Sequence, residues 1–306
     1  MEGYLTVESA KIAAIQDSGR LGYEHYGICD NGAVDMYAYL AGNALVGNAT
    51  AQPAIEITAF DFDMTSTIDI PICITGAPAD LKINSDPVQP WSTLLLPAGK
   101  VLSVSHIRKG LRVYIAIGGG IDAPKVLGSC ALDTIINLGK RLVSGQKLRL
   151  KNEDAAKSIQ CRIANPEVIP HYGSPWNIRV CDGPDIEIFK DSFTGFYEAT
   201  YKISPVSNHI GIRLSGPPVK KFYPKEILSR GVGIGSIEVF PTGQAVVLHR
   251  GRTVTAGYPI IGVVPLIDLD MIGQARPGDE VHFSHLSIKE AKKLYYDRFS
   301  RLPYRR

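Results

Sequence analysis

The apolar positions along the chain follow mostly the two-residue period of β-strands. In 54-AIEIT-58 and 101-VLSVSHI-107 apolar and polar residues alternate, which is typical of a sheet with one solvated face. No regular alternation of strands and helices separates such segments, so a doubly wound parallel sheet is not expected. The segments predicted as strands are 4–7, 54–58, 67–75, 101–107, 112–117, 177–181, 236–240, 244–249, 260–264 and 280–284.

One helix is predicted near the N-terminus. Apolar residues recur at helical spacing between positions 34 and 45. Asp30 or Asn31 is the expected N-cap, because both side chains can accept a hydrogen bond from a free backbone N–H. Gly47 is the expected end of the helix, since glycine tolerates the left-handed conformation that often follows a last turn.

A second helix is predicted over 287-SIKEAKKLYYDRF-299, where Ser287 and Glu290 have the spacing of a capping box. The last fifteen residues, 292–306, hold six Lys or Arg against one Asp. A solvated helix end is the favoured interpretation of this charge, and no nucleic-acid partner is expected.

Glycine-rich turns recur before strands, at 98-AGKVLSV-104, 144-SGQKLRL-150 and 277-PGDEVHF-283, and indicate repeated barrel construction. The segment 231-GVGIGS-236 has no long helix after it, so we interpret it as a turn and not as a nucleotide-binding loop. The run 118-GGG-120 lets the backbone approach another chain segment or a ligand closely, and both remain open.

Length and composition describe a globular protein with two domains. The 306 residues are 45% hydrophobic and 21% charged, with 30 Gly and 20 Pro. A polar and proline-rich stretch at 151–176 is the expected boundary between an N-terminal β-rich lobe over 1–160 and a C-terminal β lobe over 175–306. No apolar run approaches the roughly 20 residues of a membrane span, and the secretory signal pattern is absent, so we expect a cytoplasmic protein without a membrane partner.

No motif assigns catalytic residues. The five cysteines lack the spacings of zinc or redox sites, so they are interpreted as reduced structural thiols. His282 and His285 have no acidic pair beside them, and no metal site is expected. Neither the G-x-S-x-G elbow nor the G-x-x-x-x-G-K-[ST] phosphate loop occurs.

Several motifs together resemble a known family. Residues 16–48 read Q-D-x-G-R-x-G-Y, then G-A-x-D, then A-x-N-x-L-V-G-N, and they are followed by 112-RVYIAIGGGIDAPKVLGS-129, 257-GYP-259 and 273-GQARPGDEVHF-283. This set is similar to the family that contains the C-type subunit of 5-oxoprolinase (the Kip antagonist), allophanate hydrolase subunit 2 and part of the carboxyltransferase region of urea carboxylase. The resemblance extends over roughly residues 5–292.

The resemblance implies a mainly β, two-lobed architecture with few helices and a cyclophilin-like β-barrel. It implies a B-type (Kip inhibitor-like) partner and possibly an A-type partner, in a hetero-oligomeric 5-oxoprolinase that uses ATP to convert the small molecule 5-oxoproline to glutamate. ATP would then be bound by the complex and not by this chain alone. A non-catalytic regulatory partner and a biotin-dependent carboxyltransferase component acting on a urea-like amide are the alternatives, so whether the chain is part of an enzyme stays open.

The second half departs from the family pattern where chemistry is expected. His209 stands in place of an arginine, Glu238 in place of a glutamine and Gly251 in place of an aspartate. These departures predict weak or no 5-oxoprolinase activity, or a different small amide or lactam as the substrate, because they change donors and charges around a reacting group. Arg213 and Tyr258 match the pattern, and with His209 and Glu238 they are candidate ligand-binding residues of this half.

In the first half, Gln16, Asp17 and Arg20 are candidates to frame a ligand cleft, with Asp35 and Asn43 brought beside it by the helix. Arg20 is the expected anion-binding group, because its planar guanidinium suits a carboxylate or phosphate. The structural alternative is that Asp17 and Arg20 pair with each other and hold the loop.

Overall fold

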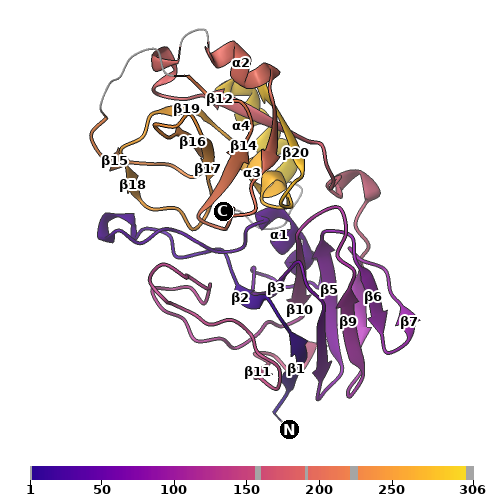
Figure 1. Ribbon diagram of the computed structural model, residues 1–306. Helices are drawn as coiled ribbons and strands as arrows, with labels where there is room; N and C mark the ends of the chain where they lie inside the picture. Colours follow the sequence, from indigo (N-terminus) through magenta and orange to yellow (C-terminus); the bar gives the residue numbers. More distant parts are fainter. Residues whose placement is uncertain (1, 156–159, 190–191, 221–226, 301–306) are drawn as a thin grey trace. The chain divides into compact units, whose positions relative to one another are not determined.

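The chain forms two compact units in the computed structural model (Figure 1). Of the residues that the structure describes, one unit contains 2–20, 35–155, 160–172 and 300, and the other contains 21–34, 173–189, 192–220 and 227–299. Strands dominate both units, as expected, and none of the helices described is long and apolar enough to cross a membrane. The structure describes residues 2–155, 160–189, 192–220 and 227–300.

The first unit consists of two sheets that share one apolar core. The sheets run in the orders β11-β1-β4-β9-β6-β7 and β2-β3-β10-β5-β8, and the core takes side chains from both, among them Val7, Met64, Ile57 and Ile115. The bounds are β1 (Tyr4–Ala10), β2 (Ala13–Gln16), α1 (Met36–Leu45), β3 (Ala54–Thr58), β4 (Phe62–Ser66), β5 (Ile70–Gly76), β6 (Asp80–Ile83), β7 (Asp86–Pro87), β8 (Thr93–Leu96), β9 (Val101–Ser105), β10 (Arg112–Ile117), β11 (Lys147–Arg149) and the 3-10 helix η3 (Pro166–Val168).

Strands β5 and β10 are buried on both faces, which explains why their residues are nearly all apolar. One face joins the sandwich core, and α1 packs on the other. The helix comes close because Gly42 has no side chain: a Cβ there would lie 3.1 Å from Thr75 Oγ1 and 3.2 Å from the Ala116 side chain. The Thr75 hydroxyl donates to the Ala38 carbonyl of the helix at 2.7 Å, so its polar group is satisfied.

The second unit is built on a closed barrel in the order β12-β19-β16-β17-β14-β13-β20. Parallel pairing of β12 with β20 completes the ring, which confirms the predicted barrel architecture. Helix α2 packs on β20, and α3 contacts both β12 and α4. The bounds are η1 (Glu24–Tyr26), β12 (Trp176–Asp182), η4 (Ile186–Ile188), α2 (Ser192–Glu198), β13 (Thr200–Ile203), β14 (Gly211–Ser215), β15 (Arg230–Gly231), β16 (Ser236–Val239), β17 (Ala245–Leu248), β18 (Thr255–Ala256), β19 (Ile260–Val263), α3 (Leu266–Ile272), β20 (Glu280–His285) and α4 (Ile288–Phe299).

The predicted N-cap of the first helix is wrong. Asn31 has a left-handed φ of 56°, and its N–H donates to the Arg250 carbonyl, so this segment belongs to the second unit. Asp35 caps α1 instead, with its side chain accepting from the Ala38 N–H at 2.9 Å. Gly47, with φ of 78°, ends the helix as predicted.

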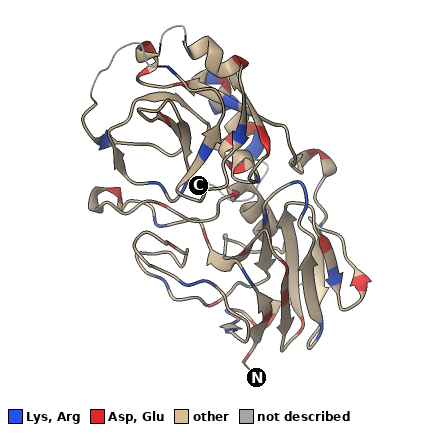
Figure 2. Ribbon diagram, viewed as in Figure 1, with Lys and Arg blue, Asp and Glu red and all other residues tan. Residues whose placement is uncertain are grey.

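The predicted capping box of the last helix is confirmed, because the Ser287 hydroxyl donates to the Glu290 carboxylate and accepts from the Glu290 N–H. Basic residues gather along α4 in Figure 2. Arg298 donates to the Ile267 carbonyl at 2.6 Å and so ties the end of α4 to α3. The rest of the basic stretch, residues 301–306, lies outside the described residues.

The glycine run 118–120 is explained by neighbouring chain segments. A Cβ at Gly118 would lie 2.9 Å from the Pro71 side chain, and one at Gly119 would lie 2.8 Å from Asn152. A Cβ at Gly120 would lie 2.9 Å from Gln52. Close approach of other chain segments therefore accounts for glycine at these positions.

Gly76 and Gly99 allow a matched test of close packing in the first unit. Both have positive φ, 94° and 72°, so alanine carries about 1–2 kcal/mol of backbone strain at either position. Only at Gly76 would the new Cβ also clash, with the Arg112 carbonyl, whereas the space at Gly99 is open. In urea unfolding we expect Gly76→Ala to lower the free energy of unfolding by about 1–3 kcal/mol more than Gly99→Ala does. Equal losses of stability in the two variants would contradict the close packing of Gly76 against the Arg112 carbonyl.

Candidate functional site

Asp17 follows β2 and binds a turn more than one hundred residues away in the sequence. Its buried carboxylate accepts from the Gly19 N–H at 2.9 Å, the Ser129 hydroxyl at 2.6 Å and the Cys130 N–H at 2.8 Å. The Cys130 thiol lies 3.2 Å from the same carboxylate. Burial, and then the negative charge of Asp17, raises the pKa of Cys130 to about 12, so the thiol stays protonated and donates. Asp17 thus holds the 129–130 turn.

Arg20 binds the continuation of that turn and not Asp17. Its side chain is only 1% exposed, and Nη2 donates to the Ala131 carbonyl at 2.6 Å. Nη1 lies 3.8 Å from Asp133 Oδ2, and the Asp133 carboxylate also accepts from the Ile135 N–H. The structural alternative, a direct pair of Asp17 with Arg20, is therefore wrong among the described residues: each binds a different part of residues 129–133.

Polar atoms of Gln16 and Arg20 remain unpaired in the interior. Arg20 Nε and Nη1 and Gln16 Oε1 are buried without a hydrogen-bond partner among the described residues. Such atoms normally meet water or a ligand, because leaving them unpaired costs about 1–3 kcal/mol each. Gln16 and Arg20 therefore remain candidates for ligand binding, with the anion role of Arg20 still a prediction.

Asp35 and Asn43 are fully buried and organise α1. Besides capping the helix, Asp35 accepts from the Tyr172 hydroxyl at 3.0 Å, and its N–H donates to the Tyr114 hydroxyl at 2.8 Å. The Asn43 amide accepts from the Gln52 N–H at 2.9 Å and donates to the Gln52 carbonyl at 3.0 Å. These contacts give both side chains a structural role in the first unit.

In the second unit, Arg213 and Glu238 lie on one face of the barrel wall. Arg213 of β14 and Glu238 of β16 are both directly opposite Val246 of β17. Directly opposite residues of antiparallel strands point to the same side of a sheet. The strand register therefore brings two candidate residues into one cross-strand row, with Val246 between them.

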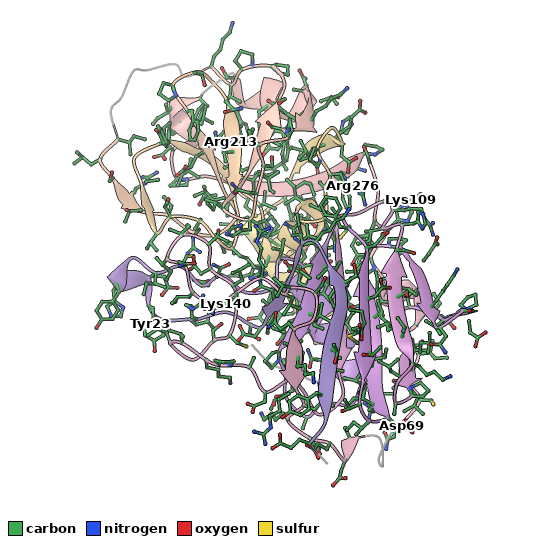
Figure 3. The ribbon with its side chains drawn as sticks, turned by 60° about the horizontal axis from the view of Figure 1, so that its bottom comes forward. Tyr23, Asp69, Lys109, Lys140, Arg213 and Arg276 are labelled. Atoms are coloured by element: carbon green, nitrogen blue, oxygen red, sulfur yellow. The ribbon has the colours of Figure 1, made fainter. Side chains whose placement is uncertain are left out.

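Arg213, which Figure 3 labels, connects this row to two aromatic rings. Its guanidinium carbon lies 5.4 Å from the Phe240 ring centroid, and the Phe240 and Tyr258 ring centroids are 4.5 Å apart. Gln244 is its hydrogen-bond partner among the described residues, at a long 3.4 Å. Most guanidinium donors thus remain available, and a half-buried arginine over an aromatic ring suits recognition of a carboxylate or phosphate.

Glu238 is a buried carboxyl group with an unpaired oxygen. It is 3% exposed, and its Oε1 makes no hydrogen bond with the described residues. Burial raises its pKa from 4.5 to about 6, because the charged form is poorly solvated. A carboxyl group with such a pKa can accept or release a proton near neutral pH, as general acid–base catalysis requires.

His209 lies before β14, next to Gly251. The Gly251 N–H donates to the His209 carbonyl at 2.8 Å, and a Cβ at position 251 would clash with the His209 ring. The histidine ring thus fills the space that a side chain at 251 would need. Phe240 and Gln244 were not predicted as site residues. The sequence indicates their position only through strand spacing: Phe240 comes two residues after Glu238, and Gln244 comes two residues before Val246, and residues two apart on a strand share a face.

The raised pKa of Glu238 predicts that replacing this carboxyl group by a neutral amide stabilises the fold, and that the gain in stability depends on pH. Because the folded-state pKa of about 6 exceeds the usual 4.5, ionised Glu238 destabilises the fold. Glu238→Gln should therefore match the wild type near pH 4.5 and become more stable as the pH rises through 6, by up to about 2 kcal/mol. Urea unfolding at several pH values measures this difference. Glu187→Gln, at an exposed site of the same unit, is the control and should show no such trend; a loss of stability in Glu238→Gln at pH 8 would reveal a missed cationic partner.

Removal of the Arg20 charge should destabilise the first unit. Arg20→Met leaves the buried Asp133 carboxylate without its cation, which typically costs about 3–5 kcal/mol. Arg108→Met is the matched control, because Arg108 pairs with Asp80 at the surface, where an ion pair contributes about 0–1 kcal/mol. Chemical denaturation compares the two variants. An unfolding free energy for Arg20→Met within the range of the control would show that Arg20 is not a structural cation.

Comparisons with known proteins agree with this architecture. The family model described as "Carboxyltransferase domain, subdomain A and B" matches residues 26–285. The chain is 31% identical to the C-type subunit of 5-oxoprolinase from Escherichia coli, over 95% of its own length and 94% of that protein. It is 30% identical to the urea amidolyase of Saccharomyces cerevisiae, covering 92% of this chain but 16% of that protein.

A solved structure shows the same fold. The crystal structure of the K. lactis urea amidolyase superposes with a TM-score of 0.91 at 25% identity, over 99% of this chain and 20% of that one. The closed barrel, the matched motifs and the similarity along nearly the whole chain agree with one another. The chain belongs to the carboxyltransferase-domain family, together with the C-type subunit of 5-oxoprolinase and the urea amidolyases.

Proposed function

We propose that this chain is the C-type component of an ATP-dependent 5-oxoprolinase complex, acting with a B-type partner and with an A-type partner that completes ring opening to glutamate. The observation that carries this proposal is the alignment over 94% of the E. coli C-type protein, against 16% of the yeast urea amidolyase. ATP would be bound by the complex, since the chain has no phosphate-binding loop of its own.

The barrel face of Arg213 and Glu238 suits the chemistry of a small lactam. Arg213 would hold the carboxylate of 5-oxoproline through its unused guanidinium donors. Phosphorylation of the lactam oxygen forms an O–P bond, breaks the terminal phosphoanhydride bond of ATP and releases the lactam N–H proton. Glu238, ionised above a pKa of about 6, would accept that proton.

A regulatory role is the second candidate, and the contact of His209 with Gly251 favours it. The family pattern has an arginine and an aspartate at these positions, whereas here the histidine ring occupies the space of the missing acid. Loss of that acid would remove several kcal/mol of transition-state stabilisation if it contacts the reacting group. A chain of this kind would bind a B-type partner without turnover. Carboxyl transfer to a urea-like amide would in addition require biotin on another protein.

The partnership and the activity can be tested together. Co-expression with a B-type homologue should yield a complex whose two proteins elute together in size-exclusion chromatography. We expect their interface to bury at least roughly 1,200 Å², as is typical of a stable complex. After addition of the A-type partner, we expect ATP-dependent release of glutamate from 5-oxoproline, slower than the median enzyme rate of about 10 per second. Glu238→Gln restores the glutamine of the family pattern and so separates two roles. If the carboxylate of this chain is the general base, kcat should fall at least about 100-fold with the complex intact, whereas a rise in kcat would mean that the amide serves the reaction better.

The results of these experiments distinguish the enzymatic role from the regulatory role. A stable complex without glutamate release would support the regulatory role, and unchanged kcat in Glu238→Gln would remove Glu238 from the reaction. Separate elution of the two proteins at micromolar concentration would refute the partnership on which both the 5-oxoprolinase role and the regulatory role depend.

A further inference from the structure

A polar pocket of about 610 Å³ lies in the first unit, at the C-terminal end of α1. Residues 46–50 of the loop after α1, Gly119 after β10, Lys151 and Asn152 after β11, and Arg162 line it. Its volume is within the range of about 300–1,000 Å³ that is usual for small-molecule sites. The ligand-binding residues predicted from the sequence are not among those that line it, so it is a separate feature of the fold.

The charge of this pocket is uncompensated. Lys151 and Arg162 contribute two positive charges, and no Asp or Glu is among the described residues that line the pocket. The neighbouring Glu153 carboxylate is engaged elsewhere, since it accepts from the Gly3 N–H at 2.8 Å. Two cations in a concave site without acids favour an anionic ligand, because field lines concentrate in such clefts.

Neutral oxygens hold both cations in place. Lys151 Nζ donates to Gln52 Oε1 at 3.0 Å, and the Gln52 amide in turn donates to the Thr50 hydroxyl at 3.0 Å. Arg162 donates to the Ala44 carbonyl at 3.0 Å and to Gln160 Oε1 at 2.8 Å. Such partners orient the two groups and leave their charges to be balanced by a bound molecule.

Glycines shape the pocket around these groups. A Cβ at Gly47 would lie 2.8 Å from Arg162 Nη1, and one at Gly119 would lie 2.8 Å from Asn152 Cβ. The Gly119 N–H is fixed by Asn48 Oδ1 at 2.9 Å. Side chains at the two glycine positions would therefore displace lining residues, so the pocket depends on their absence.

Capping of α1 explains part of this arrangement but not all of it. Arg162 stabilises the last carbonyls of the helix, where a cation is favoured. Lys151 does not contact the helix end and has a single neutral partner among the described residues. Helix capping therefore accounts for Arg162 but not for Lys151. A second cation beside the first suits a ligand with two anionic groups.

We propose that this pocket binds a small dianionic metabolite, whose carboxylate or phosphate oxygens are held by Lys151 and Arg162. The volume exceeds what a lone inorganic ion needs and suits a larger polar molecule that carries both anionic groups. The amides of Asn152 and Gln160 supply neutral donors and acceptors for its uncharged part. This proposal does not depend on the partner or reaction of the chain.

Calorimetric titration of the full chain with inorganic phosphate, and separately with succinate, tests the site at constant ionic strength. We expect saturable binding of at least one of these anions. Lys151→Gln should weaken that binding about tenfold, as for loss of a charge-assisted hydrogen bond. Lys147→Gln is the matched control, because Lys147 on β11 is exposed as Lys151 is and lies four residues away, but does not line the pocket. The Lys147→Gln variant should bind as the wild type does.

Arg162→Lys keeps the charge while it loses the planar fork, and should weaken binding with little change in the unfolding midpoint. Phosphate binding alone would identify a phosphorylated ligand, and succinate binding alone a dicarboxylate. The proposal is overturned if neither anion binds saturably, or if Lys151→Gln and Lys147→Gln change the affinity equally.

Discussion

Burial of β5 and β10 on both faces is the constraint on which the first unit depends. Once a helix covers the second face, every polar group there must find a partner inside the protein. The Tyr114 hydroxyl accepts from the Asp35 N–H and donates to the Glu56 carboxylate at 2.6 Å, so one group joins the helix start to two strands. Burial and the nearby carboxylates raise the pKa of Tyr114 well above its usual value, which keeps this donor protonated. The position of α1 follows from this network together with the close approach at Gly42.

Both units contain buried polar groups that are fully paired and others that are not. In the first unit, Asp17 and Asn43 have several partners each and connect distant segments, whereas Arg20 has two buried nitrogens without a hydrogen-bond partner among the described residues. In the second unit, Glu238 has an unpaired oxygen and Arg213 has one long hydrogen bond among the described residues. A folded protein keeps such incompletely paired groups at a cost to stability, which is the usual mark of a site that completes its bonding with a ligand.

Each segment that local periodicity predicted as a strand overlaps a strand of the structure, because alternation reports directly which face of a strand is buried. Several other strands, among them β2, β4, β6, β8, β13 and β14, were not predicted. The sequence patterns did not predict those features that depend on contacts between residues far apart in the chain. Asp30 and Asn31 have the chemistry of N-caps, yet a hydrogen bond to Arg250 draws that segment into the second unit. Equally, no spacing in the sequence indicates that Asp17 binds the turn at Ser129. The common face of the second-unit candidates depends on strand register, which alternation alone does not determine.

The contact between His209 and Gly251 limits how this chain can change by single mutations. A side chain introduced at 251 meets the histidine ring, so the ring must turn away to make room for it. The effect of a substitution at 251 therefore depends on the residue at 209. The two positions are coupled, and a substitution at one of them has to be judged together with the residue at the other.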